Sequence, residues 1–239
     1  MIRIVSETGS TNADLAAALA VGERVVEGDW LVADRQLAGH GRQGRAWLDG
    51  AGNFMGSTVV HLRSGDPAAH GLSLVAGVAL HAAITVCTAG SVDVRLKWPN
   101  DAMAGSAKLA GILLERQGDA VVVGVGVNLA QAPEVAGRDT ISLAVLGQFV
   151  SRNEFAAALA DRFSENVRTW REFGLVAVIP RWLALAHPMG ALLRVGEPGE
   201  TPIEGRFGGL DNNGALILLL EDGTTRTIHA GEVRLAASS

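Results

Sequence analysis

Two neighbouring apolar runs decide the fold class of this chain: residues 108–114, KLAGILL, and residues 120–127, AVVVGVGV. Both runs are short, rich in aliphatic side chains and bounded by turn residues, which is the pattern of buried β-strands. Residues 92–96 have the same character. We therefore predict that these three segments form the centre of a β-sheet.

Strand and helix patterns continue through the rest of residues 1–187. Further strands are predicted at residues 2–6, 30–33 and 54–62, and helices at residues 13–20, 72–90, 151–173 and 176–186. Thr11 with Asp14, and Ser151 with Glu154, have the spacing of capping boxes, which mark helix starts. The uncharged segment 72–90 is as long as a membrane span, but its polar and small residues indicate a buried helix instead.

The sequence pattern changes at His187-Pro188, where proline discourages continuation of a helix. Short strand candidates follow at residues 191–195, 203–210, 215–220 and 225–228. Asn213-Gly214 and Asp222-Gly223 favour tight hairpin turns, because glycine readily adopts a positive φ. The chain is therefore predicted to consist of an α/β domain at residues 1–187 and a small β domain at residues 188–239.

The composition is that of an ordinary globular protein with no basic excess. Of the 239 residues, 48% are hydrophobic and 19% are charged, which argues against a disordered chain. The formal net charge of -5 argues against a nucleic-acid partner. Cys87 is the only cysteine, so no intrachain disulfide can form, and residues 1–10 lack the apolar core of a signal peptide. We expect a cytoplasmic protein that binds neither nucleic acid nor membrane.

The clearest candidate for an anion site is a glycine-rich loop at residues 39–45, GHGRQGR. Its three glycines leave the backbone free to wrap around an anion, and its guanidinium groups, Arg42 and Arg45, can each donate two hydrogen bonds. It is not a Walker loop, because no Gly-Lys-Ser/Thr follows. A mobile surface loop with solvated arginines is the alternative interpretation.

Polar residues also collect at the ends of the predicted central strands. Lys97, Asn100 and Asp101 follow one strand, Lys108 opens the next, and Asn128 follows the third. Strand ends are common places for functional sites, and the Asn128 amide oxygen could coordinate a hydrated Mg2+ or a phosphate. Lys97 and Lys108 are the only lysines among 20 cationic residues, which supports a special role for both. The alternative is that they are solvated strand ends.

In this order, the motifs resemble those of the bacterial biotin-protein ligases. The resemblance rests on Ser10-Thr11-Asn12, Asp34-Arg35-Gln36, residues 39–45, 97–101, 108–115 and 124–128, and the small C-terminal β domain. It implies an α/β catalytic domain related to class II aminoacyl-tRNA synthetases, with a mixed sheet flanked by helices, followed by a Src-homology-3-like barrel. The chain begins at a predicted catalytic strand, so it resembles the monofunctional members that have no DNA-binding domain.

The resemblance also implies roles for individual residues. Lys108 and Arg42 would be catalytic. Biotin would contact Ser10, Thr11, Asn12, Gln36, Gly39, His40, Gly41, Arg42, Lys108 and Gly111. ATP and the adenylate would contact Arg42, Arg45, Trp47, Lys97, Trp98, Asn100, Asp101 and Asn128, with Asn128 a candidate Mg2+ ligand. His40 and Gln43 depart from the family, which commonly has cations at these positions.

The implied reaction joins biotin and ATP into biotinyl-5′-AMP, releases pyrophosphate, and transfers biotin to a lysine of a biotin carboxyl carrier protein domain. The implied enzyme requires Mg2+ and is a monomer or a homodimer. Two alternatives stay open. One is a lipoate or octanoate ligase on the same fold, and the other is a non-catalytic biotin sensor, which would need a DNA-reading helix.

Overall fold

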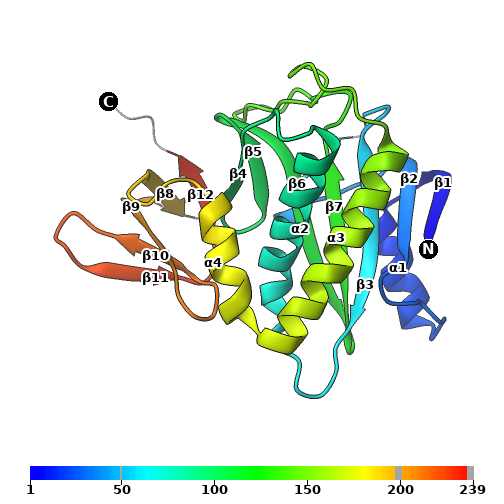
Figure 1. Cartoon of the computed structure of the whole chain (residues 1–239), viewed down its shortest axis with the longest axis horizontal. Coiled ribbons are helices and arrows are strands. Elements are labelled where there is room, and N and C mark those ends of the chain that lie inside the picture. The colour runs from blue at the N-terminus through cyan, green and yellow to red at the C-terminus, as the bar shows by residue number, and fades with distance from the viewer. Residues whose placement is uncertain (49, 197–200, 236–239) are drawn as a thin grey trace.

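A seven-stranded mixed sheet forms the centre of the larger part of the molecule (Figure 1). The computed structural model describes residues 1–48, 50–196 and 201–235. The strands of this sheet are β1 (Ile2–Thr8), β2 (Trp30–Gln36), β3 (Phe54–His61), β4 (Val94–Lys97), β5 (Asp101–Ala104), β6 (Ala107–Gln117) and β7 (Ala120–Val127). Their order across the sheet is β1-β2-β3-β7-β6-β5-β4; β1 and β2 are parallel, and the other neighbours are antiparallel.

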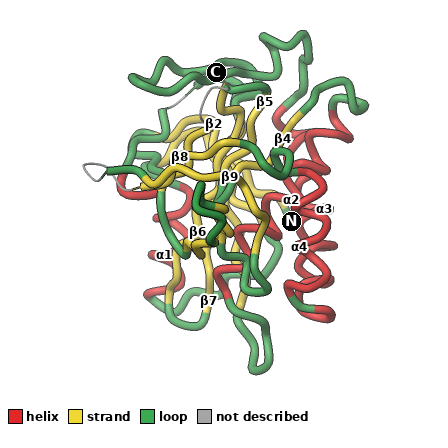
Figure 2. Tube along the Cα trace, turned by 90° about the vertical axis from the view of Figure 1, so that its left-hand side faces the viewer, coloured by secondary structure: helices red, strands yellow, loops and turns green. Residues whose placement is uncertain are grey.

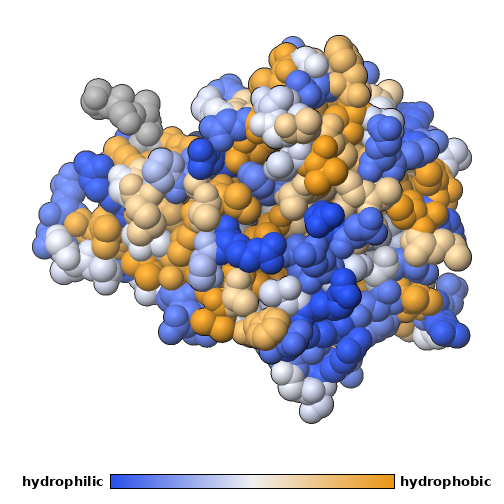
Figure 3. Space-filling model, in the orientation of Figure 1, coloured by the Kyte–Doolittle hydropathy of each residue, from blue (hydrophilic) through white to orange (hydrophobic). Residues whose placement is uncertain are grey.

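Within the described residues, four α-helices lie against this sheet: α1 (Thr11–Ala20), α2 (Leu72–Cys87), α3 (Arg152–Phe173) and α4 (Leu175–Leu185). α2 and α3 pack side by side over one face, and α1 lies on the opposite face (Figure 1). Because successive strand residues point to opposite faces, the sheet contributes to a large apolar cluster with α2 and α3 and to a small one with α1. Hydrophilic residues cover much of the outward side of α3 (Figure 3).

Two of the three apolar runs that we expected at the centre of the sheet lie there. β7 is the middle strand, with β3 on one side and β6 on the other. The third prediction was wrong, because β4 is an edge strand. Its apolar residues Val94 and Leu96 are buried because α2 and α4 pack on this strand, and not because strands lie on both sides of it.

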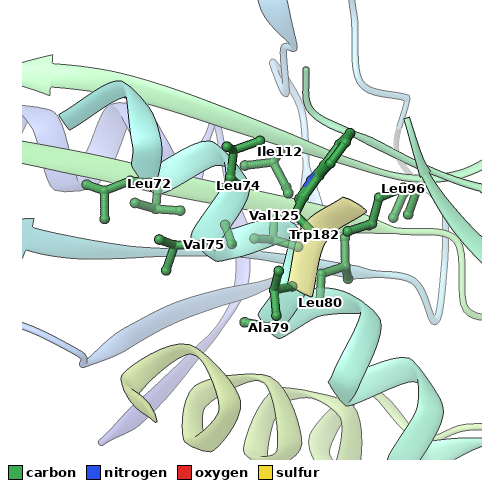
Figure 4. Close-up of a cluster of buried hydrophobic side chains, with 14 of the residues drawn as sticks. Leu72, Leu74, Val75, Ala79, Leu80, Leu96, Ile112, Val125 and Trp182 are labelled. Atoms are coloured by element: carbon green, nitrogen blue, oxygen red, sulfur yellow. The ribbon is translucent and has the colours of Figure 1, made fainter. Parts of the chain in front are cut away.

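α2 is buried within the fold, as predicted. By length and composition alone, residues Ala69–Cys87 could cross a membrane. In the structure, however, Leu72, Leu80 and Ile84 are almost fully buried. Figure 4 shows side chains of α2 among those of β6, β7 and Trp182 of α4. This is the environment of a core helix in a globular domain.

The cap residue agrees with the prediction at α3 and differs from it at α1. The Ser151 hydroxyl accepts a hydrogen bond from the Glu154 N–H at 3.2 Å, so Ser151 caps α3; the Glu154 carboxylate accepts from this hydroxyl at 2.8 Å and not from the Ser151 backbone N–H, as it would in a full capping box. The predicted box of Thr11 and Asp14 is wrong, because Ser10 takes the cap position of α1. Thr11 is instead the first residue of the helix, where its hydroxyl is free to bond elsewhere.

A second, antiparallel sheet follows α4 (Figure 2). Its strands are β8 (Leu192–Gly196), β9 (Ile203–Leu210), β10 (Leu216–Leu219), β11 (Thr225–Ile228) and β12 (Glu232–Leu235), in the order β11-β10-β9-β8-β12. Gly214 and Gly223 each have a φ of +82° in the two predicted hairpin turns. The predicted domain boundary at His187-Pro188 falls between α4 and β8 and remains a prediction. Residues 197–200 and 236–239 of the predicted second domain lie outside the described residues.

Candidate active site

A cavity of about 1130 Å³ lies on the side of the central sheet that α1 covers. Its wall includes the start of α1, the loop after β2, parts of β6 and β7, residues 133–140 and β12. The predicted site residues in this wall are Ser10, Thr11, Asn12, Gln36, His40, Gly41, Arg42, Arg45, Trp47, Lys97, Trp98, Asn100, Asp101, Lys108, Gly111 and Asn128. Gly39 lies beside the cavity, under Trp47. The fold therefore brings all the predicted motifs to one place.

Three glycines make room for this cavity. Gly111 on β6 pairs with Gly126 on β7, and Gly124 lies two residues before Gly126, on the same face of the sheet. A Cβ atom on Gly124 would overlap the Asn12 side chain, and one on Gly126 would overlap the ring of Trp47. A larger residue at either position would therefore displace a side chain of the site.

The glycine-rich loop folds back on itself as a short hairpin. His40 and Ala46 form an isolated antiparallel bridge, and the turn between them is the short 3-10 helix Arg42–Gly44. Arg42 points toward Asn100, and 3.4 Å separate its Nη1 from Asn100 Oδ1. Because Arg42 lines the cavity, the structure favours an anion site over a solvated surface loop.

Four buried polar side chains form a hydrogen-bonded chain in one part of the cavity wall. Gln36 Oε1 accepts from the Thr11 N–H at 2.7 Å and lies 3.0 Å from the Thr11 hydroxyl. That hydroxyl lies 2.7 Å from the Ser57 hydroxyl, which lies 2.5 Å from Asn12 Oδ1. Ser57 was not predicted, although it is a small polar residue in a strand that the sequence marks as largely buried.

Glu115 is a second residue that the sequence analysis left without a role. Its Oε2 accepts from Asn12 Nδ2 at 2.6 Å, and its Oε1 lies 3.3 Å from Nε2 of His40. Asn12 belongs to α1 and His40 to the glycine-rich loop, so one carboxylate joins these two elements. The three residues are far apart in the sequence, and only the fold brings them together.

The two lysines share one buried carboxylate. Asp101 Oδ1 lies 2.5 Å from Lys108 Nζ, and Asp101 Oδ2 lies 3.2 Å from Lys97 Nζ. Burial alone would raise the pKa of Asp101, but the two lysines outweigh it and hold this pKa below its usual value. Burial lowers the pKa of Lys108, and Asp101 offsets this only in part. The cluster therefore fixes two ammonium groups in the cavity wall.

Glu232 of β12 joins two arginines at the edge of the cavity. Its Oε1 lies 3.2 Å from Arg45 Nη1 and 2.9 Å from Arg138 Nη2. Burial alone would raise the pKa of Glu232, but Arg45, Arg138 and Arg234 outweigh it and lower this pKa. Glu232 and Arg138 were not predicted. Arg45, predicted to hold phosphate, is paired with a carboxylate here.

Two tryptophans of the predicted site differ in their surroundings. The ring of Trp47 lies against Gly126 and has Lys108 Nζ 5.7 Å from its centre. Its buried N–H has no hydrogen-bond partner among the described residues. Trp98 is buried in the main apolar cluster, and its indole N–H donates to the Gly214 carbonyl at 3.0 Å. Trp98 therefore joins the part of the chain next to the seven-stranded sheet to the second sheet, besides lining the cavity.

Asn128 does not stand among metal ligands. Its Nδ2 donates to the Ile141 carbonyl at 3.1 Å, which fixes the side chain under residues 133–140. Among the described residues, no group of three His, Cys, Asp or Glu side chains could hold a metal ion. Asp101, the nearest carboxylate in the lysine cluster, already bonds two ammonium groups. The described residues therefore form no cage of three such ligands for Mg2+.

The arrangement combines two chemistries in one cavity. Glu115 does not line the cavity itself but bonds the wall residues Asn12 and His40, and it lies seven residues after Lys108 on β6. A strand rises roughly 3.3 Å per residue, so the two groups are well separated along the cavity. Such a site suits an elongated ligand with a polar head at one end and an acid group at the other.

Two family models match the chain: "Biotin/lipoate A/B protein ligase family" over residues 19–129 and "Biotin protein ligase C terminal domain" over residues 194–235. A biotin–acetyl-CoA-carboxylase ligase from Paracoccus denitrificans is 36% identical over 226 residues, which cover 90% of this chain and 92% of that protein. The chain belongs to the biotin protein ligase family. A ligase of the same name from Mycobacterium tuberculosis is 37% identical over 234 residues, which cover 96% of this chain and 87% of that protein.

Solved structures of biotin protein ligases also match. The biotin protein ligase from Aquifex aeolicus in complex with biotin and ATP has a TM-score of 0.85 and 29% identity, and the match covers 99% of both chains. The bifunctional ligase/repressor of Escherichia coli is 35% identical over 91% of this chain, which spans 69% of that longer protein. The predicted family and fold class are therefore confirmed.

Proposed function

We propose that this biotin protein ligase uses ATP to activate biotin as biotinyl-5′-AMP and then transfers the biotinyl group to a lysine of a biotin carboxyl carrier protein domain. The observation that carries this proposal is that one cavity contains both fixed cations and a polar pocket. This pocket, called the head-group pocket, is formed by Gln36, Thr11, Ser57 and Asn12. ATP and biotin are the ligands named for the similar ligase of Aquifex aeolicus. The carrier follows from the name of the similar carboxylase ligases.

The polar pocket favours biotin over lipoate as the acid. The ureido ring of biotin carries two N–H donors, whereas the lipoyl and octanoyl groups carry none. Gln36, Thr11, Ser57 and Asn12 present oxygen atoms to each other within 3.0 Å, so they form a set of acceptors. These oxygen atoms already bond one another, but an apolar head group would offer no donor to their remaining lone pairs, which is costly.

The first chemical step is attack of a biotin carboxylate oxygen on the α-phosphorus of ATP. Pyrophosphate leaves, and the product is a mixed anhydride whose AMP is a good leaving group. Negative charge builds on the α-phosphate, so fixed cations near it accelerate the step. Lys108 and Arg42 are the candidates, because both line the cavity on the side away from the head-group pocket.

In the second step the acceptor lysine amine attacks the carbonyl carbon of the adenylate. A tetrahedral intermediate forms, AMP leaves, and the amine loses a proton. The loop from His40 to Ala46 lines the cavity, and its closure would keep water away from the anhydride. Mg2+ would enter with the phosphates of ATP, because the described residues form no metal cage.

The test is a mass measurement on an isolated biotin carboxyl carrier domain. After incubation with this protein, ATP, Mg2+ and biotin, we expect the carrier to gain one biotinyl group. No gain is expected with lipoate or octanoate in place of biotin, or without ATP. A lipoylated carrier would favour the lipoate ligase, and an unmodified carrier together with tight biotin binding would favour a non-catalytic sensor.

The location and the assembly of the protein are part of the same proposal. ATP and carboxylase carriers occur together in the cytoplasm, and we place the enzyme there. A cavity that contains both predicted ligand sites within one chain is compatible with a monomer or a homodimer. Light scattering with and without biotin and ATP distinguishes these two states.

A further inference from the structure

The hydrogen-bonded chain of the head-group pocket contains more oxygen–oxygen contacts than hydroxyl protons that could bridge them. Three links join Gln36 Oε1, the Thr11 hydroxyl, the Ser57 hydroxyl and Asn12 Oδ1, at 3.0, 2.7 and 2.5 Å. Each hydroxyl supplies one proton, so only two of the three links can be hydrogen bonds at once. The chain is therefore one donor short as long as both of its ends are oxygen atoms.

Both ends of the chain are held as oxygen atoms by groups outside it. At one end, Gln36 must present its oxygen, because it accepts from the Thr11 N–H at 2.7 Å. At the other end, Glu115 is a carboxylate and only accepts, so the atom 2.6 Å from it must be the Asn12 amide nitrogen. Asn12 Oδ1 is then turned toward Ser57.

The longest of the three links is the weakest hydrogen bond, so it is the first to be left without a proton. If Thr11 donates to Ser57 at 2.7 Å and Ser57 donates to Asn12 at 2.5 Å, both hydroxyl protons are used. The 3.0 Å link between Gln36 Oε1 and the Thr11 hydroxyl is then a pair of acceptors. An N–H group of a ligand in the cavity would satisfy it, since both residues line the cavity wall.

We propose that Glu115 is a specificity-determining positioning residue, which keeps the head-group pocket short of one donor by fixing the orientation of the Asn12 amide. If the amide turned over, its nitrogen would donate to Ser57, the missing proton would be supplied, and the demand for a ligand N–H would disappear. The inference rests on the proposed function, because the ureido N–H of biotin is the donor that the pocket would select.

Glu115 also ties this selection to the glycine-rich loop. Its second oxygen lies 3.3 Å from His40 Nε2, so a loop that closes over the cavity brings its own hydrogen-bond donor to the same carboxylate. The side chain of Glu115 is 37% exposed, so water can reach it. Removing it takes the acceptor from the buried Asn12 amide nitrogen, but the amide can then turn this nitrogen toward Ser57, so we expect the fold to tolerate substitution.

The experiment compares Glu115→Ala and Glu115→Gln with the wild-type protein and with Glu165→Gln. Glu165 is an exposed carboxylate on α3 that pairs with Arg162 at 2.9 Å, far from the cavity wall, so it controls for loss of a charge. Calorimetry measures the Kd of biotin, of a biotin analogue methylated on one ureido nitrogen, and of ATP. The Kd of the methylated analogue divided by the Kd of biotin measures how strongly the pocket selects for the N–H donor.

We expect Glu115→Ala to weaken biotin binding by roughly 10-fold and to reduce the preference for biotin over the methylated analogue by a similar factor. The methyl group has the same steric effect in the wild-type protein and in Glu115→Ala, so this effect cancels when their Kd ratios are compared. Glu115→Gln should have a biotin affinity and a preference between those of the wild type and Glu115→Ala, since its amide can offer either a nitrogen or an oxygen to Asn12. The ATP Kd and the melting temperature should stay those of the wild type, as in Glu165→Gln.

An unchanged preference in both Glu115 variants, with biotin bound, overturns the inference. So does an equal loss of ATP and biotin affinity, which would indicate general damage. Failure of the proposed function has a different signature, because wild-type protein would then form no biotinyl-adenylate from biotin and ATP. The binding ratio measured without ATP would still decide the role of Glu115.

Discussion

Glu232, on the last strand of the second sheet, lies 3.2 Å from Arg45 in the glycine-rich loop. The same carboxylate oxygen lies 2.9 Å from Arg138, in the segment that forms another part of the cavity wall. A residue of the small sheet therefore holds two arginines of the catalytic part of the chain. This contact gives the second sheet a direct influence on the loop.

Replacing Glu232 with alanine should loosen the glycine-rich loop and weaken ATP binding. Arg45 is 39% exposed, so the lost contact is worth at most about 1 kcal/mol, or roughly 5-fold in the KM for ATP. Hydrogen exchange of residues 39–47 should become faster. Glu204→Ala is the matched control, because Glu204 pairs with Arg194 at 2.7 Å in the same sheet. Equal effects in both variants would mean that the second sheet acts only through its stability.

Sequence patterns predicted the long and regular elements well and the short ones poorly. The strand at Ile203–Leu210 and the helix that ends at Phe173 agree with the predictions, because periodicity and caps define them locally. β5 and β12 have four residues each and were missed. β4, β10 and β11 also have four residues, but an apolar run or an adjacent hairpin dipeptide marks each of them, whereas β5 and β12 depend on their neighbours in the sheet.

The candidate site shows the same limit. Motif residues such as Lys108 and Asn12 were found because they stand in recognisable stretches, and the fold brings them to one cavity. Ser57, Glu115 and Glu232 were missed because their importance comes from contacts across the fold. No local pattern reports which polar side chain will face a cavity.

Gly124→Ala should damage biotin binding with little loss of fold. The added Cβ would overlap the Asn12 side chain and push it out of the hydrogen-bonded chain. We expect the KM for biotin to rise by about 10-fold or more, because a buried hydrogen bond is lost and the Asn12 side chain in the cavity wall is displaced. The KM for ATP should change little. Steady-state adenylate formation measures both.

Gly9→Ala is the matched control for this substitution. A Cβ on Gly9 would meet open space, and the residue precedes the cap of α1 without lining the cavity. Its kinetics should be those of the wild type. If Gly124→Ala binds biotin normally, Asn12 has room to move and the head-group pocket is not as tightly packed as the structure indicates.

The glycine-rich loop should become protected when both substrates are present. In the structure, Arg42 lines the cavity and Trp47 lies against Gly126, so ligands would contact the loop directly. Hydrogen exchange of residues 39–52 should slow when biotin and ATP are added together; Asp49 within this range lies outside the described residues. Unchanged exchange at adenylate-saturating conditions would contradict a role of the loop as a lid.

A partly buried ion pair outside the cavity should contribute to the loss of stability in acid. Arg171 of α3 lies 2.5 Å from Glu27 and 3.2 Å from Asp66. Burial alone would raise the pKa of Glu27, but hydrogen bonds from Arg171 and from the His61 N–H, with the charges of Arg171 and Arg63, lower it. A lowered carboxyl pKa stabilises the fold above the usual pKa of the group, and this contribution is lost as the pH falls through the lowered value.

Glu27→Gln should therefore unfold more easily than the wild type at neutral pH. The loss of charged hydrogen bonds is worth about 1.5–3 kcal/mol, or a fall of several degrees in Tm. The difference between the two proteins should shrink as the pH falls through the lowered pKa of Glu27, where the carboxyl group becomes protonated. Thermal melts from pH 3 to pH 7 measure it. A constant difference across this range would show that packing, and not the charge of Glu27, stabilises the contact.

Lys108→Ala should slow adenylate formation far more than it weakens biotin binding. Lys108 is fixed by Asp101 at 2.5 Å and stands next to the Trp47 ring, so its ammonium group is held in the cavity wall before any substrate arrives. Loss of one such preorganised donor costs on the order of 100-fold to 1000-fold in turnover. Lys108→Arg should retain little of the wild-type rate, because the planar guanidinium group is larger than an ammonium group and donates its hydrogen bonds in different directions.

Lys97→Ala is the informative comparison, because Lys97 bonds the other oxygen of the same carboxylate at 3.2 Å. If the two lysines only neutralise Asp101, either substitution should harm stability and rate alike. If Lys108 stabilises the charge that develops on the α-phosphate, single-turnover adenylate formation at saturating biotin and ATP should fall much further in Lys108→Ala, with melting temperatures that match. A wild-type rate of adenylate formation in Lys108→Ala would make this lysine structural, and the fixed positive charge of the mechanism would then have to come from Arg42 alone.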